Sequence, residues 1–498
     1  MNLSLLFLDS SERRTQPKSL ARDLNLDRLL GESTLGLLLT ICTPEEREAR
    51  LGIFRLLGNS GFAESFRRLD ETLTALSQTS TASKSAKCEF ESLIFARNLC
   101  VSCTAALDEL DRLCVYGLDN ALTLCIRRFS ESVSERREIL REAVSSTEPD
   151  VSAFSELSLT YLPGKLTLTK RRDESISDRL TELIRGMGLS PTVRSCSMRV
   201  PPELSDSFSR LFPESFARLK SLCGLADSLA EALLKLRREI GFYLELTGLA
   251  KRAKAAGMSV CSPVYSDYSV FRARNAYDFT LLVKDAKVIP NDIDFDESSA
   301  VSFLTGTNGG GKTTYLRCTA ANLLLALAGC IVFADSAEVG CFDTIRAHFP
   351  ADESFSSEGR LFEEARRVDS ILSACGRGSF VFMNETYSGA DDIKGANLTV
   401  ETARKLRDRG VFALWVTHFH EAAAETAGEP GFAPLTTVVD ESDSSNRTFR
   451  IVKKRGGGSS FAEDILKKYS LDAKSLERAL RENQPSGERS AGKDESAL

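Results

Sequence analysis

Hydrophobic residues recur at helical spacing through the first half of the chain. Between residues 26 and 76, apolar side chains lie three and four positions apart, which predicts short helices. The polar stretch 77–87 predicts a loop, and segments with helical periodicity dominate residues 88–260. The pattern therefore predicts a small helical N-terminal region over residues 1–87, followed by a larger helical region that ends near residue 260.

The longest helical pattern covers residues 216–256. As a single α-helix this segment would be about 60 Å long at 1.5 Å per residue. Gly224, Gly241 and Gly248 are the positions at which such a helix could bend. Periodicity alone fits two interpretations, a long lever arm and an ordinary helix of a bundle.

A β-hairpin is predicted inside the helical region, near residues 157–169. Apolar and polar residues alternate there on both sides of Pro163 and Gly164. The second arm of the hairpin is basic, with Lys165, Lys170, Arg171 and Arg172. A basic hairpin at the end of helical arms could contact nucleic-acid phosphates, but a solvated run of charge explains the same residues.

From residue 261 onward, short apolar strands alternate with helical patterns. The predicted strands cover residues 301–304, 331–333, 380–383 and 413–416. This rhythm predicts an α/β domain with a mostly parallel sheet, which extends to about residue 482. Residues 483–498 are rich in Ser, Gly, Glu and Lys, a composition that predicts a disordered tail.

Composition and charge narrow the class of protein. A chain of 498 residues with 42% hydrophobic and 27% charged residues is typical of a soluble protein with several domains. A net charge of −6 argues against a uniformly basic surface, although it leaves room for a local basic face. The N-terminus lacks the features of a secretory signal, and the most apolar stretch, residues 323–334, is too short to span a bilayer. We therefore expect a cytoplasmic protein without a membrane segment.

The cysteines also favour a reducing compartment. Thirteen cysteines are scattered along the chain without the paired spacing of a disulfide framework. Cys100 and Cys103 form the one C-x-x-C pattern, but there is no second pair and the three histidines are distant in sequence. This favours two positions on a helix over a metal or redox site.

The most specific motif is GTNGGGKTT, residues 306–314, which follows a predicted strand and precedes a helical pattern. It satisfies the G-x-x-x-x-G-K-[ST] pattern, in which backbone N–H groups point at phosphate oxygens. Lys312 would reach the β and γ phosphates, and Thr313 would offer its hydroxyl to Mg²⁺. A glycine-rich turn that binds nothing is the alternative, and the strand–loop–helix context favours an ATP-binding P-loop.

Two further strands end in polar residues. Residues 380–383 lead into Asn384 and Glu385, of which Glu385 can orient or deprotonate an attacking water. An amide such as Asn384 carries no negative charge, which leads to the hypothesis of weaker Mg²⁺ retention or slower turnover. Residues 413–416 lead into Thr417 and His418, and His418 could hydrogen-bond the γ phosphate or the water.

Together, TGTNGGGKTTYLR, the strand that ends in Asn-Glu, SGADDIKG and VTHFHE resemble the ATPase of the MutS DNA mismatch repair family. Upstream, VIPNDI (residues 288–293) is similar to the nucleotide-binding segment that precedes the family's P-loop. Downstream, residues 449–480 are similar to the closing helix-turn-helix that packs the family's dimer. Specific matches cover residues 235–482, and a vaguer helical similarity covers residues 88–234.

The resemblance implies an α + α/β fold, in which a helical lever or arm region precedes an ABC-type P-loop ATPase domain. It implies a DNA-dependent ATPase that uses ATP and Mg²⁺ to gate the binding of duplex or branched DNA, with low sequence specificity, by a homodimer. The candidate catalytic residues are Lys312, Glu385 and His418, and the candidate Mg²⁺ ligands are Thr313 and, through a water, Asn384. The candidate ATP-binding residues are Val288, Asn291, Gly306, Thr307, Asn308, Gly309, Gly310, Gly311, Lys312, Thr313 and Thr314.

The sequence departs from the family's pattern at several positions. The usual Asp-Glu pair is Asn384–Glu385, and Val288 replaces the aromatic residue that stacks on adenine, which should weaken base stacking. The signature segment, here residues 356–372, lacks the usual Ser-Thr-Phe run. Its helix N-terminus could still offer N–H donors and a cation to the γ phosphate of a partner subunit, although an amphipathic helix with a solvated face fits as well. The candidate residues for this contact in trans are Ser356, Ser357, Gly359 and Arg360.

Roughly 80 residues precede the main helical region, which leaves no room for the family's mismatch-reading and connector domains. We therefore expect a short form that acts in DNA repair or recombination without reading mismatches itself. A nucleotide-gated binding module with little hydrolysis is the alternative, and Asn384 favours it. A transporter-type ATPase subunit should carry a Leu-Ser-Gly-Gly-Gln signature, which this sequence does not contain.

Overall fold

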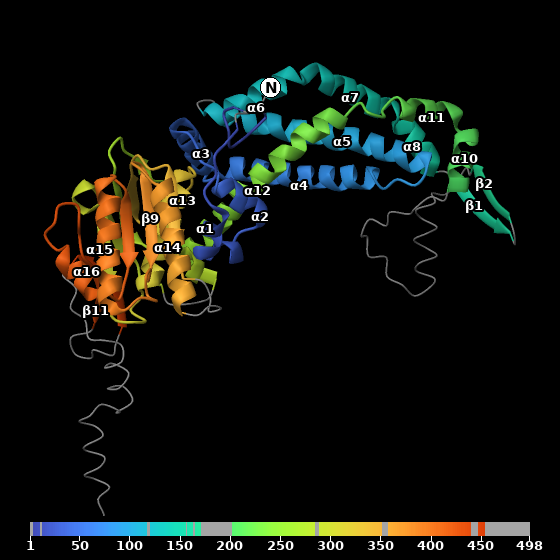
Figure 1. Ribbon diagram of the computed structural model, residues 1–498. Helices are drawn as coiled ribbons and strands as arrows, with labels where there is room; N and C mark the ends of the chain where they lie inside the picture. The colour runs from blue at the N-terminus through green and yellow to red at the C-terminus, as the bar shows by residue number, and fades with distance from the viewer. Residues whose placement is uncertain are drawn as a thin grey trace, which may run out of the picture. The chain divides into compact units, whose positions relative to one another are not determined.

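The computed structural model describes residues 3–9, 12–116, 120–155, 157–162, 165–170, 202–283, 288–350, 357–439 and 447–453. The chain forms two compact units (Figure 1). The helical unit consists of Met1–Arg13, Gly31–Leu37 and Cys42–Leu249, and the sheet unit consists of Arg14–Leu30, Leu38–Ile41 and Ala250–Leu498. The first 87 residues are thus divided between the two units. The domain divisions at residues 87, 260 and 482 stay predictions.

The helical unit is built around α5 (Glu89–Cys114), which packs against α4, α6, α7, α10 and α11. Figure 1 shows α4 and α7 running along α5. The other helices of this unit are α2 (Glu32–Leu38), α3 (Pro44–Leu56), α4 (Ser60–Ser83), α6 (Ala121–Ser132), α7 (Ser134–Ser146), α8 (Glu148–Ser155), α10 (Pro202–Leu211), α11 (Pro213–Lys220) and α12 (Asp227–Ala255), the last of which continues into the sheet unit.

Helix α5 carries the C-x-x-C pair. Cys100 and Cys103 are both fully buried, and burial raises the pKa of the Cys100 thiol to about 11 and that of the Cys103 thiol to about 12. Within the described part of the chain, no group of three or more metal-ligating side chains is assembled. By length and hydropathy alone, α5 is the one described helix that could cross a membrane, a test that the core helix of a soluble protein also passes.

One local prediction in this unit is wrong. The loop predicted for residues 77–87 is largely helical, since α4 continues to Ser83. Leu76 is fully buried, and the hydroxyls of Thr79 and Thr81 donate to the carbonyl oxygens four residues earlier, at 3.0 and 2.9 Å. These polar side chains therefore find hydrogen-bond partners on the backbone of α4 itself, without ending the helix.

The helical pattern over residues 216–256 does not form one continuous helix. It is interrupted between α11 and α12, where Gly224 adopts a φ of +76°. Gly224 lies in the turn between these two helices, and α12 then extends for about 44 Å at 1.5 Å per residue. Gly241 and Gly248 lie inside α12 and do not interrupt it.

The predicted hairpin position holds two paired strands. β1 (Leu157–Leu162) follows α8 directly and pairs antiparallel with β2 (Lys165–Lys170). Leu157 lies opposite Lys170, and Leu162 lies opposite Lys165. Two of the four basic residues, Arg171 and Arg172, lie outside the described residues.

The sheet unit contains a six-stranded mixed sheet in the order β12-β11-β6-β10-β9-β8. β12 is antiparallel to β11 at one edge, and the other neighbouring strands are parallel. Its strands are β6 (Val301–Thr305), β8 (Thr344–His348), β9 (Ser379–Asn384), β10 (Phe412–Val416), β11 (Leu435–Val439) and β12 (Arg447–Lys453). The strands predicted at 301–304, 380–383 and 413–416 are therefore confirmed as β6, β9 and β10.

The strand predicted at residues 331–333 is wrong. Val332 makes one isolated bridge, to Cys261, and no ladder continues from it. The next N–H group, of Phe333, donates to the side-chain oxygen of Asn322 at 2.7 Å instead of to a neighbouring strand. The apolar run correctly indicates burial here. The backbone N–H of Phe333 is bonded by the Asn322 side chain and not by a neighbouring strand, so no strand forms.

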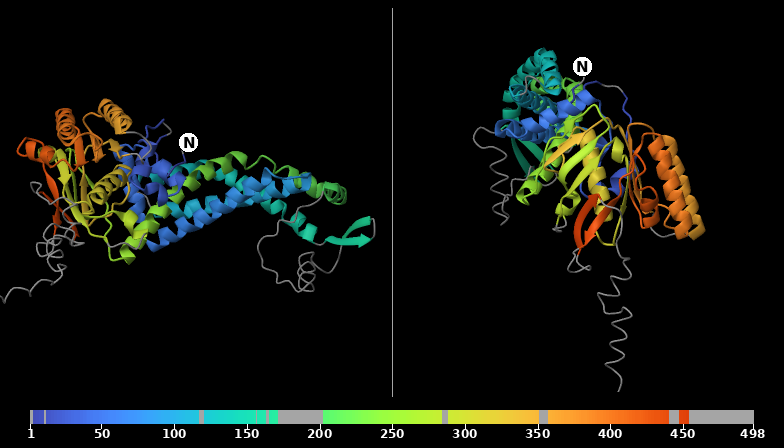
Figure 2. Two further views of the ribbon diagram at one scale, coloured as in Figure 1. Left: turned by 60° about the horizontal axis from the view of Figure 1, so that its bottom comes forward. Right: turned by 90° about the vertical axis from the view of Figure 1, so that its left-hand side faces the viewer.

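The six-stranded sheet is covered on both faces. α14 (Ser357–Ala374), α15 (Asp392–Asp408) and α16 (His420–Glu425) pack on one face, which Figure 2 shows in orange. On the other side, α13 (Lys312–Leu327) contacts β9, β10 and β4. All residues of β6, β9 and β10 are buried as a result, which explains their continuous apolar sequences.

A second, four-stranded sheet has the order β3-β7-β4-β5. Its elements are β3 (Val264–Tyr265), β4 (Phe271–Ala276), β5 (Asn291–Phe295) and β7 (Ser336–Val339), with the short 3₁₀ helices η2 (Phe279–Val283) and η3 (Glu297–Ser299) nearby in sequence. Phe295 of β5 contacts Phe380 of β9, with ring centroids 5.1 Å apart. The two sheets therefore share an aromatic core.

The N-terminal part of the sheet unit includes α1 (Lys18–Asp23) and η1 (Leu26–Arg28). The side chain of Gln16 accepts from Ile345 N–H at 3.0 Å and donates to the Asp343 carbonyl at 2.8 Å. An exposed strand edge invites pairing with other chains, and these contacts occupy part of the β8 edge.

Candidate functional site

The glycine-rich loop, residues 306–311, connects β6 to α13. Gly306, Gly309 and Gly311 have φ angles of +128°, +72° and +91°. A Cβ atom at Gly306 would lie 2.1 Å from Thr437 Oγ1 on β11. Gly306 is therefore required both by its backbone conformation and by the close approach of β11.

Lys312 is buried and folds back over this loop. Its ammonium donates to the carbonyl oxygens of Gly306 and Thr307 at 2.9 and 3.1 Å, and to Asn308 Oδ1 at 3.2 Å. Burial lowers the pKa of Lys312, while the negative charge of Glu385 acts in the opposite direction. The loop thus surrounds a cation whose three partners are neutral oxygens, an arrangement that suits an incoming anion.

Thr313 and Asn384 come together from α13 and β9. Thr313 Oγ1 donates to Asn384 Oδ1 at 3.2 Å, and Asn384 is buried. Both side chains offer neutral oxygen atoms, which Mg²⁺ accepts as ligands directly or through a bound water. These oxygen atoms are of the type that Mg²⁺ binds. The carboxylate next to them in sequence is that of Glu385.

Glu385 follows β9 in an unusual backbone conformation. Its φ is +48°, and its N–H donates to the carbonyl of Val416, the last residue of β10, at 2.8 Å. The side chain is half-buried, and its carboxylate makes no hydrogen bond or ion pair with the described residues. This carboxylate is therefore available to a ligand or a water.

His418 follows β10 and is exposed. Its ring lies against Phe419, with centroids 4.0 Å apart. Because β10 lies between β6 and β9, the glycine-rich loop, Glu385 and His418 all follow the carboxyl ends of neighbouring parallel strands. In open α/β sheets, this edge is where ligands bind.

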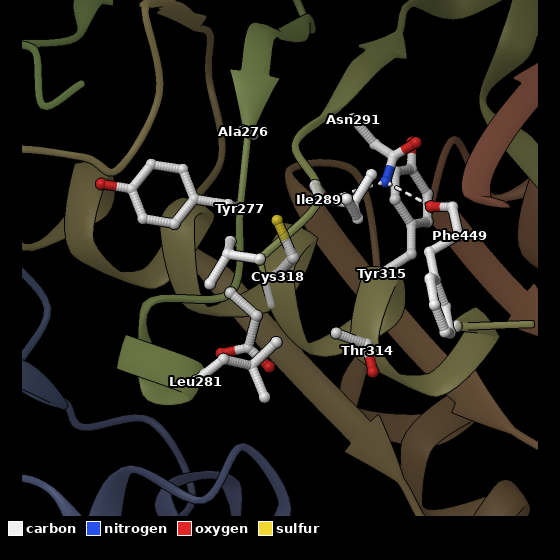
Figure 3. Close-up of a pocket in the computed structure, with 12 residues that line it drawn as sticks. Ala276, Tyr277, Leu281, Ile289, Asn291, Thr314, Tyr315, Cys318 and Phe449 are labelled. Atoms are coloured by element: carbon white, nitrogen blue, oxygen red, sulfur yellow. Dashed lines mark hydrogen bonds between the residues drawn. The ribbon is translucent and has the colours of Figure 1, made fainter. Parts of the chain in front are cut away.

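A pocket of about 230 Å³ adjoins the loop (Figure 3). It is lined by Ala276, Tyr277, Asp278, Leu281, Val288, Ile289, Asn291, Gly311, Thr314, Tyr315, Cys318 and Phe449. The predicted residues Val288 and Asn291 are thus brought to the same cavity as the end of the loop. Asn291 donates to the Phe449 carbonyl at 2.9 Å and accepts from Ile451 N–H at 2.8 Å, which fixes β12 beside the pocket.

Phe449 is a lining residue that the sequence analysis did not single out. A Cβ at Gly311 would lie 3.3 Å from its ring, and the residue has a φ of +56°. Its side chain is 42% exposed, which is unusual for phenylalanine and leaves ring surface for a ligand. The sequence signal was a lone aromatic residue among the polar residues of a short strand. An aromatic ring thus lines this pocket from β12.

The four residues predicted to act in trans are only partly described. Ser356 lies outside the described residues, and α14 begins at Ser357 with Gly359 and Arg360 in its first turns. Further along α14, Glu364 and Val368 are buried and Arg366 is exposed, as in an amphipathic helix. The contact in trans stays a prediction. The first residues of the predicted closing helix-turn-helix, 449–453, belong to strand β12, and its remaining residues and the predicted tail lie outside the described residues.

Residues 302–484 match the family model described as MutS domain V. This part of the chain is similar to MutS domain V. The DNA mismatch repair protein MutS of Chlorobium phaeovibrioides is 25% identical over 261 residues, which is 51% of this chain and 30% of the relative. MutS of Granulibacter bethesdensis is 30% identical over 193 residues, 38% of this chain and 21% of the relative.

Endonuclease MutS2 of Thermus thermophilus matches a longer part of the chain. It is 27% identical over 377 residues, 71% of this chain and 50% of the relative. The chain thus spans half or less of the length of these curated relatives. The resemblance to the MutS family is confirmed, and it extends beyond domain V.

Proposed function

We propose that this MutS-like chain is a DNA-dependent P-loop ATPase that hydrolyses ATP to gate DNA binding by a homodimer. It acts in the cytoplasm, in DNA repair or recombination. One observation carries the proposal. Buried Lys312, the Thr313–Asn384 pair and the Glu385 carboxylate, which pairs with none of the described residues, lie at the carboxyl edge of neighbouring strands, next to the pocket.

ATP binding follows from the loop and the pocket. The phosphates lie against the backbone N–H groups of residues 306–314, where the N-terminus of α13 adds a favourable dipole. Lys312 exchanges its neutral oxygen partners for phosphate oxygens, a charge-assisted and therefore stronger interaction. The adenine occupies the pocket beside Phe449, whose ring offers a stacking surface.

Hydrolysis uses the residues that follow the strands. Thr313 and, through a water, Asn384 would hold Mg²⁺, which would supply positive charge to the phosphates. Glu385 orients or deprotonates the attacking water, and His418 hydrogen-bonds the γ phosphate or that water. The amide of Asn384 lacks the charge of a carboxylate, so turnover is slow.

DNA and a second copy of the chain complete the proposal. The names of the relatives, DNA mismatch repair protein and endonuclease, support DNA as the partner. The helical unit holds duplex or branched DNA with low sequence specificity. Ser356, Ser357, Gly359 and Arg360 reach the γ phosphate in the other subunit, where N–H donors and an arginine suit an anion.

The direct test is the Mg²⁺-dependent ATPase rate of the wild type, Glu385→Gln and Lys312→Ala. Glu385→Gln should lower kcat by about 10²- to 10⁴-fold and keep ATP binding, because it removes only the base. Lys312→Ala should lose ATP binding. The rates are compared with single-stranded, perfect, mismatched and junction DNA. A rate that no DNA changes would contradict DNA dependence.

A nucleotide-gated binding module with little hydrolysis is the second candidate, and Asn384 favours it. Asn384→Asp supplies the missing charge and should raise both the ATPase rate and its dependence on Mg²⁺. If the wild type binds ATP but turns over no faster than Glu385→Gln, the binding module is correct. If Asn384→Asp changes neither quantity, the role assigned to this position is wrong.

A further inference from the structure

A buried polar pair lies directly behind the candidate catalytic carboxylate. His348, the last residue of β8, has its Nδ1 atom 2.9 Å from the hydroxyl oxygen of Thr386. The side chains are almost completely buried, with 2% of His348 and 0% of Thr386 exposed. Neither residue belongs to a motif used above. The hydrogen bond joins the end of β8 to the residue that follows Glu385.

The segment after β9 is held by a separate contact at each residue. The Asn384 side chain is held by Thr313, and the Glu385 N–H by the carbonyl of Val416. His348 holds Thr386, and the Tyr387 hydroxyl pairs with a threonine hydroxyl of α15 at 3.1 Å.

The backbone of this segment needs such support. Glu385 and Tyr387 have φ angles of +48° and +66°, and non-glycine residues rarely adopt these values. A backbone of this kind costs roughly 1–3 kcal/mol per residue and persists where the surroundings enforce it. Thr386 lies between the two strained residues, so its side chain is well placed to enforce both.

His348 is suited to hold Thr386 as a neutral hydrogen-bonding side chain, not as a positive charge. Burial, together with the positive charge of Arg367 on α14, lowers the pKa of His348 to about 4, so the ring is neutral near pH 7. Its other ring nitrogen, Nε2, has no hydrogen-bond partner among the described residues. Burying an imidazole with one nitrogen unpaired reduces stability, and an apolar residue would fill this space without that loss.

We propose that His348 is a positioning residue which, through Thr386, holds the Glu385 carboxylate in its catalytic orientation. The inference rests on the proposed ATPase function and assigns that activity a residue on β8. His348 touches neither nucleotide nor water in this role. It acts on kcat through the backbone of Glu385, and a misplaced base lowers the rate even when the nucleotide is still bound.

The test uses Thr386→Val, which removes the hydroxyl and keeps the shape, with Thr386→Ser as its matched control. Thr386→Val should lower kcat on the order of 10- to 100-fold, with KM and ATP affinity unchanged. Thr386→Ser should keep most of the wild-type kcat. His348→Phe should match Thr386→Val, and the double variant should lose no more than either single variant, because both changes break one interaction.

Wild-type kcat in Thr386→Val would overturn the proposal, as would equal losses in Thr386→Val and Thr386→Ser. If His348→Phe does not fold, the two threonine variants carry the test, and thermal melts confirm their folding. The Glu385→Gln variant distinguishes a failure of the proposed ATPase function from a failure of the positioning role of His348. If it leaves the rate unchanged, the proposed function fails. If it lowers the rate and Thr386→Val does not, only the positioning role fails.

Discussion

The helical unit and the sheet unit differ in where their backbone departs from ordinary conformations. Among the described residues, all five non-glycine residues with positive φ belong to the sheet unit, and three of them are Glu385, Tyr387 and Phe449. Glu385 and Phe449 belong to the candidate site, and Tyr387 lies two residues from Glu385. Strained backbone collects at functional sites because the surrounding structure must hold a precise geometry there.

Buried polar groups show the same difference. In the helical unit, Glu239 on α12 accepts from the Ser4 hydroxyl and from Leu5 N–H, and Arg50 donates to the Leu6 carbonyl. These groups fasten the first residues of the chain to the helices. In the sheet unit, buried Lys312, Asn384, Thr386 and His348 gather at one strand edge. In these examples, polar burial fastens residues 4–6 to the helices in one unit and gathers at the candidate site in the other.

The largest expected effect tests whether the units are independent. Leu233 is fully buried on α12, so Leu233→Ala should lower the unfolding free energy of the helical unit by about 2–5 kcal/mol. Circular dichroism reports on the helices, and the single tryptophan, Trp415 on β10, reports on the sheet unit by fluorescence. Leu211→Ala, at a half-exposed position on α10, is the control. If the Trp415 midpoint in urea shifts as much as the helical signal, the units unfold together.

The second prediction concerns pH. Burial raises the pKa of Glu239 to about 7, above its ordinary value of 4.5, although hydrogen bonds and Arg50 act in the opposite direction. The folded state therefore binds more protons than the unfolded state, and the resulting stability is present below pH 4.5 and lost as the pH rises through about 7. Glu239→Gln should remove this pH dependence. The unfolding free energy of the wild type should fall by up to about 3 kcal/mol over this pH range, at 1.36 kcal/mol per pKa unit.

Urea unfolding of the helical unit at successive pH values measures this slope. Glu64→Gln is the control, because Glu64 is exposed and its ion pairs with arginine lower its pKa, so that it titrates below this window. An unchanged slope between pH 4.5 and 7 in Glu239→Gln would assign the pH dependence to other groups.

Two glycines should respond with opposite signs. Gly306→Ala places a Cβ at positive φ and 2.1 Å from Thr437 Oγ1, so it should destabilise the sheet unit by about 1–3 kcal/mol and weaken ATP binding. No atom lies within 4 Å of a Cβ at Gly248, so Gly248→Ala should stabilise α12 by about 0.5–1 kcal/mol. Trp415 fluorescence and circular dichroism measure the two changes, and equal signs would contradict the comparison.

The smallest effects should be the same in both units. Thr43 caps α3 by accepting from Glu46 N–H at 3.2 Å, and Asp391 caps α15 by accepting from Lys394 N–H at 2.9 Å. Replacement of either by alanine should cost about 1 kcal/mol in urea unfolding. Thr43→Ser and Asp391→Asn keep a capping oxygen and should stay near wild type. If Thr43→Ser or Asp391→Asn lowered the unfolding free energy as much as alanine does, the capping hydrogen bond would not be the cause of the loss.

Local patterns predicted the parts of the fold that depend on neighbours in sequence. The apolar strands that lead into the glycine-rich loop, Glu385 and His418 were correct, because strands covered on both faces carry continuous apolar residues. The predictions failed where tertiary contacts prevailed. α4 continues through a polar stretch beside buried Leu76, and Val332 is buried without becoming part of a strand.

By itself, the sequence determined the phosphate-loop motif, the order of the site segments along the chain and the family resemblance, since each depends on residues close together in the chain. Only the tertiary structure decided which distant residues join them. Phe449 reaches the pocket beside Asn291, 158 residues away, and His348 meets Thr386 across 38 residues. Periodicity shows which face of an element is buried, but not which element packs against it. Those two pairings therefore became visible only when the strands were assembled side by side.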